Sequence, residues 1–244
     1  MIPRHWQTFE VQQIAKIIRG ASPRPKGDPK YYGGNIPRLM VADVTRDKKY
    51  ITPSIDFLTN EGADLSRLMP AGTLVLGCSG LVGVPGILAV DACIHDGFLG
   101  FENISSEADK EFLYYYFCSL QERFHAAATH GGIFTNLTTS ILKEFEITLP
   151  PLQEQKKIAS VLQYWDHAVD LTEQLITAKQ ERRTWLMQQL LTGKRRLPGF
   201  SQSNKQQKNR YGSLPKDWGY PPIGKLASDV SVKNGDGVER PVLS

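Results

Sequence analysis

The longest regular pattern in this sequence is one apolar face of a helix, and it constrains the fold more than any other feature. Between residues 158 and 190, side chains of this face recur at alternating steps of three and four, which is the spacing of a helix. Pro150 and Pro151 precede the pattern, and Gly193 and Pro198 follow it as stop signals. The sequence therefore predicts one uninterrupted helix.

The length of this helix predicts how its apolar face is covered. A helix from Gln153 to Thr192 is about 60 Å long at about 1.5 Å per residue. One modest domain cannot bury so long a face, so we expect the face to pack on a second long helix, as in a coiled coil. The residues expected to form this helix pairing are Ile158, Leu162, Trp165, Val169, Ile176 and Leu186.

Composition sets broad limits on the class of protein. With 244 residues, 41% hydrophobic and 22% charged, the chain has room for one good-sized domain plus extensions. The first residues lack an apolar run of signal-peptide length. The longest uncharged stretch, residues 68–90, is interrupted by glycines and prolines, which indicates turns rather than a membrane span. We expect a cytoplasmic protein without a membrane partner. The net charge of +4 allows a nucleic-acid partner without requiring one.

Sequence motifs for catalysis and metal binding are missing. The chain has no GxxxxGK[ST] phosphate loop, no GxGxxG fingerprint and no HExxH motif. Its two Pro-Pro pairs lack the leading Asn or Asp of an adenine methyltransferase motif. Cys78, Cys93 and Cys118 are widely spaced, and the histidines lack ligand spacing. We therefore expect reduced cysteines, no catalytic residues and no metal site.

Residues 1–149 are expected to form one mixed, β-rich domain in an α+β fold. The glycine-interrupted segment Thr73–Val90 predicts short strands joined by tight turns. Residues Glu107–Thr129 predict one helix, capped by Ser105 or Ser106. A glycine loop, a short helix capped by Asn136 and a strand, EFEITL, complete the domain.

The end of the sequence resembles its beginning. A shift of 212 positions aligns Trp6 with Trp218 and Ile14 with Leu226, with several further matches in register. This predicts a repeated unit of domain plus helix. The expected organisation is a domain at 1–149, a long spacer or dimerisation helix at 150–196, a linker at 197–213 and the truncated start of a second domain at 214–244.

Several of these segments together resemble one known family, the specificity subunits of type I restriction-modification systems. The matching segments are Trp6 with Ile14–Gly20, GASPRPKGDPKYYGGNIPRLMVADV, TLVLGCSG, LYYYF, HGGIFTNLTTSIL, LPPLQEQKKIASVL, the pair Asp166 and Asp170, and LMQQLLTGKRRLPGF. They cover residues 2 to 200 and resume at 214. The sequence departs from the family pattern at Arg38, where tryptophan is usual, at His95-Asp96-Gly97, where Asn-Gln-Gly is frequent, and in its nearly absent second domain.

The resemblance implies a function. Such a subunit is non-catalytic and reads one half-site of a bipartite target in double-stranded DNA through its target-recognition domain. The long helix pairs antiparallel with another and sets the half-site separation. The implied partners are methyltransferase subunits and restriction or translocase subunits, which would use S-adenosylmethionine, ATP and Mg²⁺; this chain itself would need no cofactor.

Two loops supply the candidate DNA-binding residues. Cations, aromatic rings and amides can neutralise phosphates and hydrogen-bond base edges. The first loop contributes Arg24, Lys26, Lys30, Tyr31, Tyr32, Asn35 and Arg38, and the second contributes His130, Thr135, Asn136 and Thr138. Under the alternative interpretation, both are ordinary solvent-facing turns with two packing tyrosines. His95 beside Asp96 is expected to form a turn or a DNA-facing polar cluster rather than an acid/base pair.

The spacer helix carries cations with two interpretations. They are Lys156, Lys157, Arg182, Arg183, Lys194, Arg195 and Arg196. They form either a solvated face, with its C-terminal members favoured by the helix dipole, or a contact with the DNA backbone or the methyltransferase subunits.

Other functional interpretations stay open at this point. We expect two copies of the chain to pair through the helix on a two-fold symmetric target. The alternatives are a truncated, inactive fragment of a two-domain protein, or a scaffold for proteins that does not read DNA. An autonomous nuclease or methyltransferase is disfavoured by the missing motifs.

Overall fold

The computed structural model describes residues 3, 5–131, 134–200, 205–209, 212–219 and 221–228, without the side chains of residues 129–135 and 209. The chain divides into two compact units, residues 1–168 and 169–244, and each is described by itself. The described residues form mixed sheets, several short helices and one long helix, which confirms the α+β class.

The first unit contains thirteen strands and six short helices among its described residues, and the long helix α7 begins in it. The strands are β1 (Gln7–Glu10), β2 (Lys16–Arg19), β3 (Tyr32–Leu39), β4 (Tyr50–Ile51), β5 (Asp56–Leu58), β6 (Leu68–Met69), β7 (Leu74–Gly77), β8 (Pro85–Leu88), β9 (Ala92–Ile94), β10 (Phe98–Glu102), β11 (Thr129–Gly131), β12 (Phe134–Asn136) and β13 (Glu146–Leu149). The helices are α1 (Val11–Ile14), α2 (Val41–Asp47), α3 (Asn60–Asp64), α4 (Lys110–Ser119), α5 (Gln121–Ala127), α6 (Thr139–Lys143) and α7 (Leu152–Leu190).

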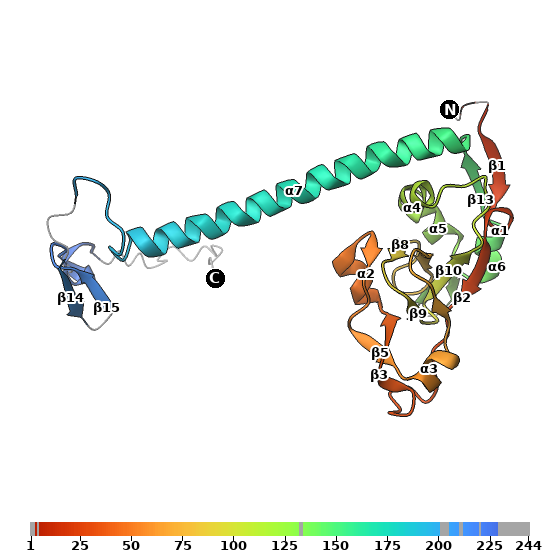
Figure 1. Ribbon diagram of the computed structural model, residues 1–244, viewed down its shortest axis with the longest axis horizontal. Helices are drawn as coiled ribbons and strands as arrows, with labels where there is room; N and C mark the ends of the chain where they lie inside the picture. Colours follow the sequence, from red (N-terminus) through yellow and green to blue (C-terminus); the bar gives the residue numbers. More distant parts are fainter. Residues whose placement is uncertain are drawn as a thin grey trace, which may run out of the picture. The chain divides into compact units, whose positions relative to one another are not determined.

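Two sheets organise this unit. The larger has the strand order β2-β10-β7-β8-β4, and the smaller has the order β5-β3-β9-β6. Strand β1 pairs antiparallel with β13, so the start of the domain lies beside the strand that leads into α7. In Figure 1, β3, β5 and α3 lie at the end of the unit away from β1 and β13.

Strand β7 explains how the core is divided. Its four residues are all buried, which indicates a strand covered on both faces rather than one. Leu74 and Leu76 belong to the larger core cluster, which includes Phe112 and Phe117 of α4, whereas Val75 points into the smaller cluster. The predicted short strands of segment 73–90 are β7 and β8, joined by a tight turn and paired antiparallel.

The prediction of one helix over residues 107–129 is wrong in two respects: the helix begins later, and it is divided into two. It begins at Lys110, capped by the carboxylate of Asp109, which accepts the backbone N–H of Phe112 at 2.9 Å. It breaks at Leu120 into α4 and α5. The predicted cap Asn136 is also replaced: Thr138 accepts the N–H of Ile141 at the start of α6. Each actual cap lies directly before its helix, where the side chain reaches the third N–H.

The long helix is anchored on the domain by one buried amide. Gln155, in the first turn of α7, is fully buried. Its side-chain N–H groups donate to the carbonyls of Glu107 and Pro150, both at 2.8 Å, and its side-chain oxygen accepts the N–H of Asp109 at 2.8 Å. A buried amide with all these partners fixes a geometry that apolar contact alone would leave loose.

In the second unit, the end of α7 holds the segment that resembles the start of the chain. Gly193 adopts a left-handed φ of 68°, and a side chain there would collide with Pro215. Arg196 donates two hydrogen bonds to Asp217, at 2.8 and 2.9 Å, and lies over the ring of Trp218. The residues predicted as a linker include a strand, because β14 (Gln206–Asn209) pairs with β15 (Gly212–Pro215).

The aligned segments at the two ends share a local structure. The N–H of Trp6 donates to the carbonyl of Pro3 at 3.1 Å, and that of Trp218 donates to Pro215 at 3.0 Å. Their surroundings differ: Ile14 is buried in the first unit, whereas its counterpart Leu226 is 71% exposed. The shared turn is therefore set by the local sequence, and the burial is set by the rest of the domain.

The anchoring amide leads to a stability prediction. Changing Gln155→Leu leaves the two carbonyls and the N–H of Asp109 without their partner, so we expect a loss of about 2–4 kcal/mol in the free energy of unfolding. Urea denaturation followed by circular dichroism measures it. The control is Gln153→Leu, at an exposed position of the same helical turn; equal stability of the two variants would contradict the anchoring role.

Candidate nucleic-acid interface

The loop between β2 and β3 carries the first group of candidate residues on a defined framework. The hydroxyl of Tyr32 donates to the carbonyl of Pro23 at 2.8 Å, and the Asp28 carboxylate accepts the N–H of Lys30 at 2.9 Å. Arg24 and Lys26 are exposed on this loop. The loop therefore presents cations outward from a fixed backbone.

The ion pairs of these cations are weak and exposed. Arg24 lies 3.8 Å from Asp96, and Lys30 lies 3.3 Å from Glu61, with more than half of each of the four side chains accessible. The hydrogen bond from Lys30 to Glu61 and the charge of that carboxylate raise the pKa of Lys30. Exposed pairs contribute little to stability, so both cations can be exchanged onto a phosphate at small cost.

Aromatic and amide groups lie next to these cations. Tyr31 and Tyr32 are half-buried, and Asn35 on β3 is exposed. The ammonium of Lys30 lies 5.5 Å from the ring centre of Tyr31. The packing expected of the two tyrosines under the alternative interpretation is therefore partly present, while Asn35 is open to a ligand.

The position of Arg38 does not agree with the expectation that this residue contacts DNA. Its side chain is 6% exposed and forms an ion pair with Asp56. It also donates to the hydroxyl of Ser22 at 2.8 Å and lies over the ring of Tyr32. Arg38 is therefore buried against the protein's own residues and holds Ser22 of the loop, instead of facing outward toward a DNA ligand.

Arg19, which was not among the candidate residues predicted from the sequence, connects the second loop to the framework of the first. Arg19, the last residue of β2, donates to the Asp96 carbonyl at 3.0 Å and to the Asn136 side chain at 3.5 Å. Asn136 also forms a β-bridge with Ser79. Thr138 serves as the cap of α6, and the side chains of His130 and Thr135 lie outside the described residues. The only sequence signal for Arg19 is a cation at the end of an apolar run.

A glycine permits this approach. A Cβ on Gly20 would collide with the carbonyl oxygen of His95, so no larger residue fits between the first loop and the His95-Asp96 turn. The Asp96 carboxylate accepts the Ser22 hydroxyl at 2.7 Å. Partial burial opposes its ionisation, but the hydrogen bonds from Ser22 and from a backbone N–H, with a smaller contribution from the charge of Arg24, outweigh burial and lower the pKa of Asp96.

His95 belongs to a turn and not to an acid/base pair. Its Nδ1 accepts the backbone N–H of Gly97 at 2.8 Å, which requires an unprotonated Nδ1. Burial and the nearby Arg38 guanidinium lower the pKa of His95 against the opposing charge of Asp96. Neutral His95 is thus part of the framework that carries Asp96.

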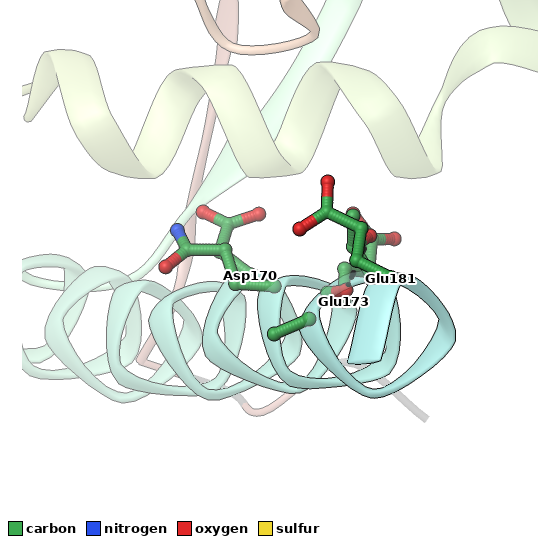
Figure 2. Close-up of a pocket in the computed structure, with 6 residues that line it drawn as sticks. Asp170, Glu173 and Glu181 are labelled. Atoms are coloured by element: carbon green, nitrogen blue, oxygen red, sulfur yellow. Dashed lines mark hydrogen bonds between the residues drawn. The ribbon is translucent and has the colours of Figure 1, made fainter. Parts of the chain in front are cut away.

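The long helix has faces of different character. Lys179, Arg182 and Arg183 border an apolar groove that includes Leu186 and Leu190. Figure 2 shows Asp170, Glu173 and Glu181 along another groove of α7, lined also by Gln174, Thr177 and Ala178. Carboxylates repel phosphates, so this second face is unsuited to DNA. Arg196, bound to Asp217, fits neither interpretation of the helix cations, because it holds the protein's own chain.

Most of the predicted helix-pairing residues are open. Trp165, Val169 and Ile176 are 63%, 51% and 51% exposed, and Leu162 is 37% exposed. Ile158 instead packs against the larger core cluster of the domain. An apolar stripe of this length on a helix indicates a partner surface.

The described part of the chain contains neither a metal-binding cluster nor a membrane-spanning helix. No group of three or more His, Cys, Asp or Glu side chains there could hold a metal ion. No helix there is long and apolar enough to cross a membrane.

The position of His95 leads to a pH prediction. The pKa of His95 lies below the ordinary 6.5 in the folded state, so the unfolded chain takes up the proton first as pH falls. Burial of the neutral imidazole is therefore compatible with full stability above pH 6.5, and the free energy of unfolding decreases as pH falls below 6.5. We expect ¹⁵N NMR to show the Nε2–H tautomer at neutral pH and a titration midpoint below 6.5. The resonance is assigned with His95→Asn; a midpoint above 6.5 would exclude the buried neutral role.

Comparison with known proteins places the chain in a family. Residues 3–179 match the model of the type I restriction modification DNA specificity domain. The match includes all but the first two residues of the first unit and continues into α7 beyond it. The chain therefore belongs to the family of type I restriction-modification DNA specificity proteins.

Individual relatives agree with this assignment. The type I restriction enzyme MjaIX specificity subunit of Methanocaldococcus jannaschii is 29% identical over 175 residues, covering 69% of this chain and 40% of the relative. The MjaVIII specificity subunit of the same organism is 24% identical over 240 residues, covering 96% of this chain and 51% of the relative. The chain thus spans about half the length of the curated relatives it matches.

Solved structures show the same fold. The HsdS subunit from Thermoanaerobacter tengcongensis superposes with a TM-score of 0.55 at 21% identity, over 72% of this chain and 40% of that chain. The type I restriction-modification S subunit from M. genitalium gives 0.53 at 19% identity, over 75% and 45%.

Proposed function

We propose that the chain is a DNA sequence-specificity subunit of a type I restriction-modification complex and performs no catalysis itself. The observation that carries the proposal is the family match over residues 3–179, which covers both the recognition domain and most of its helix. The exposed cations of the β2–β3 loop and the adjoining Asn136 supply the chemistry that DNA reading requires.

The two kinds of contact have separate roles in this proposal. Arg24, Lys26 and Lys30 neutralise phosphates and fix the position of the domain on the duplex. Asn35, Arg19 and Asn136 hydrogen-bond base edges in the major groove and supply sequence discrimination. Each good bidentate pair contributes about 1–3 kcal/mol of discrimination against a wrong base.

The helix determines the distance between half-sites. Its 39 residues span about 58 Å, which matches about 17 base pairs at about 3.4 Å each. Paired with a second long helix through the exposed stripe, it would hold two recognition domains on one duplex. Methyltransferase and restriction subunits would assemble on this frame and use S-adenosylmethionine, ATP and Mg²⁺, and the complex would act on DNA in the cytoplasm.

Removing the loop charges tests the DNA interface. In the triple variant Arg24→Gln, Lys26→Gln, Lys30→Gln, we expect weaker binding on every duplex and a salt slope smaller by about 0.9 per lost phosphate contact. Fluorescence anisotropy over a salt series measures both. The control removes three lysines from other elements, Lys16, Lys110 and Lys143. If the loop variant keeps both the DNA affinity and the salt slope of wild type, the DNA-facing assignment of this loop is wrong; if wild type itself does not bind DNA, the scaffold interpretation is favoured.

Helix pairing is tested separately. We propose a second copy of α7 as the partner of the stripe and expect a dimer by light scattering. Val169→Glu with Ile176→Glu places charges in the stripe, so dissociation is expected to increase by at least about tenfold, since each buried carboxylate costs more than 1.4 kcal/mol. The control, Ser160→Glu with Gln174→Glu, adds the same charge at exposed positions away from the stripe. A wild-type chain that stays monomeric at all concentrations would refute pairing between copies.

A further inference from the structure

A charged network joins the recognition domain to the long helix beyond its first turns. Its centre is Lys49, which is 9% exposed although it carries a positive charge. It directly precedes β4, and its partners lie on α4. Helix α4 lies alongside the first part of α7 (Figure 1), and both helices contribute side chains to the network.

The lysine is enclosed by aromatic rings. Its ammonium nitrogen lies 4.1 Å from the ring centre of Tyr115, 5.1 Å from that of Tyr114 and 5.2 Å from that of Tyr50. Rings at these distances stabilise a cation that has lost part of its water. Full compensation of a buried charge also requires an anion.

Glu111 is that anion, and it bridges three elements through one oxygen atom. Its Oε2 lies 2.9 Å from the Lys49 ammonium. The same oxygen accepts the Tyr50 hydroxyl at 2.9 Å and the side-chain N–H of Gln163 on α7 at 3.0 Å. Burial opposes ionisation of this carboxyl, but its donors outweigh burial and lower the pKa of Glu111.

Tyr115 makes the second link to the long helix. Its hydroxyl accepts a hydrogen bond from the Lys49 ammonium at 2.9 Å and donates to the carboxylate of Asp166 on α7 at 2.5 Å. Partial burial and the hydrogen bond to Asp166 raise the pKa of Tyr115, so the phenol keeps its proton. Lys49 is thus connected to α7 by two routes, through Gln163 and through Asp166.

These links lie on the side of α7 that faces the domain. Steps of three and four place Gln163 and Asp166 on the same side as Gln155 and Ala159, which are buried. Beyond Asp166, the same side continues into the acidic groove of Figure 2. Gln163 and Asp166 thus bond to the domain further along this side than Gln155 does.

A long helix magnifies any error in direction at its base. An angular change of about 5° moves the end of a helix of about 58 Å by about 5 Å, which exceeds the rise of about 3.4 Å per base pair. Anchoring by Gln155 alone fixes one point, whereas a direction needs a second. Directional hydrogen bonds at Gln163 and Asp166, two and three turns further along, supply it.

We propose that the network of Lys49, Tyr50, Glu111, Tyr115, Gln163 and Asp166 fixes the direction in which α7 leaves the domain and thereby determines which half-site spacing the protein accepts. The inference rests on the proposed function and assigns these groups as positioning residues. They act through α7 and do not contact DNA. A purely structural role would change stability without changing the preferred spacing.

The direction of the helix can be measured without DNA. Spin labels on p-acetylphenylalanine at positions 26 and 164 of the full chain leave the native cysteines unlabelled, and both sites are exposed. In Tyr115→Phe, which loses both hydrogen bonds but keeps the ring, we expect a broader distance distribution than in wild type. Tyr116→Phe is the matched control, because its hydroxyl accepts the N–H of Thr148 instead. A Tyr115→Phe distribution as narrow as that of the control would overturn the positioning role.

Spacing selectivity is the second readout. Duplexes that carry both half-sites, selected from random DNA by the wild-type complex, are lengthened or shortened by one base pair in the spacer. We expect wild type and Tyr116→Phe to bind the parent spacer about tenfold more tightly, and Tyr115→Phe to discriminate by only about threefold, since small misplacements distant from a site can cost large factors.

The two readouts separate failure of the inference from failure of the proposed function. Unchanged selectivity in a stably folded Tyr115→Phe, with DNA binding intact, overturns the inference alone. Absence of sequence-specific DNA binding by every chain, wild type included, overturns the proposed function, and the spin-label distances still decide the positioning role. Asp166→Asn supplies a second mild variant, because it weakens the same link to Tyr115, and it is expected to behave as Tyr115→Phe does.

Discussion

The junction between Gln155 and the α4 start is the interaction on which the rest of the structure depends. One amide satisfies the carbonyls of Glu107 and Pro150 and the N–H of Asp109, and so ties the last strand of the domain, the α4 cap and the first turn of α7 together. Without these hydrogen bonds, the first turn of α7 would lose its directional contacts with the domain. With them, the end of the last strand and the cap of α4 are joined directly to the first turn of α7.

Features with a local cause could be predicted from the sequence. The apolar period and flanking prolines predicted a helix from Gln153 to Thr192, and α7 runs from Leu152 to Leu190. The glycine-rich strands followed from turn chemistry. The cap of α4 was predicted wrongly: Asp109 competes with Ser105 and Ser106 as a capping residue, and only packing decides which side chain meets the free N–H groups.

The candidate site shows where a sequence pattern reaches its limit. A cation in a Gly/Pro-rich loop predicts exposure, yet Arg38 lies inward because β3 places it beside Asp56 and Ser22, which are distant in sequence. Arg19 was missed for the converse reason: only the close approach at Gly20 brings it to Asp96 and Asn136. Non-local pairing decides both cases. The roles of the individual loop residues in DNA binding stay predictions.

The uneven burial of α7 also has a dynamic consequence. Contacts with the domain stabilise its first turns, whereas beyond Asp166 its apolar side chains are largely exposed among the described residues. Isolated helices gain little from propensity alone, so local opening should become easier along the helix away from the domain. Binding of a second helix along the stripe would then also suppress this local opening. The full helix length that separates two recognition domains would be maintained only in the assembled state.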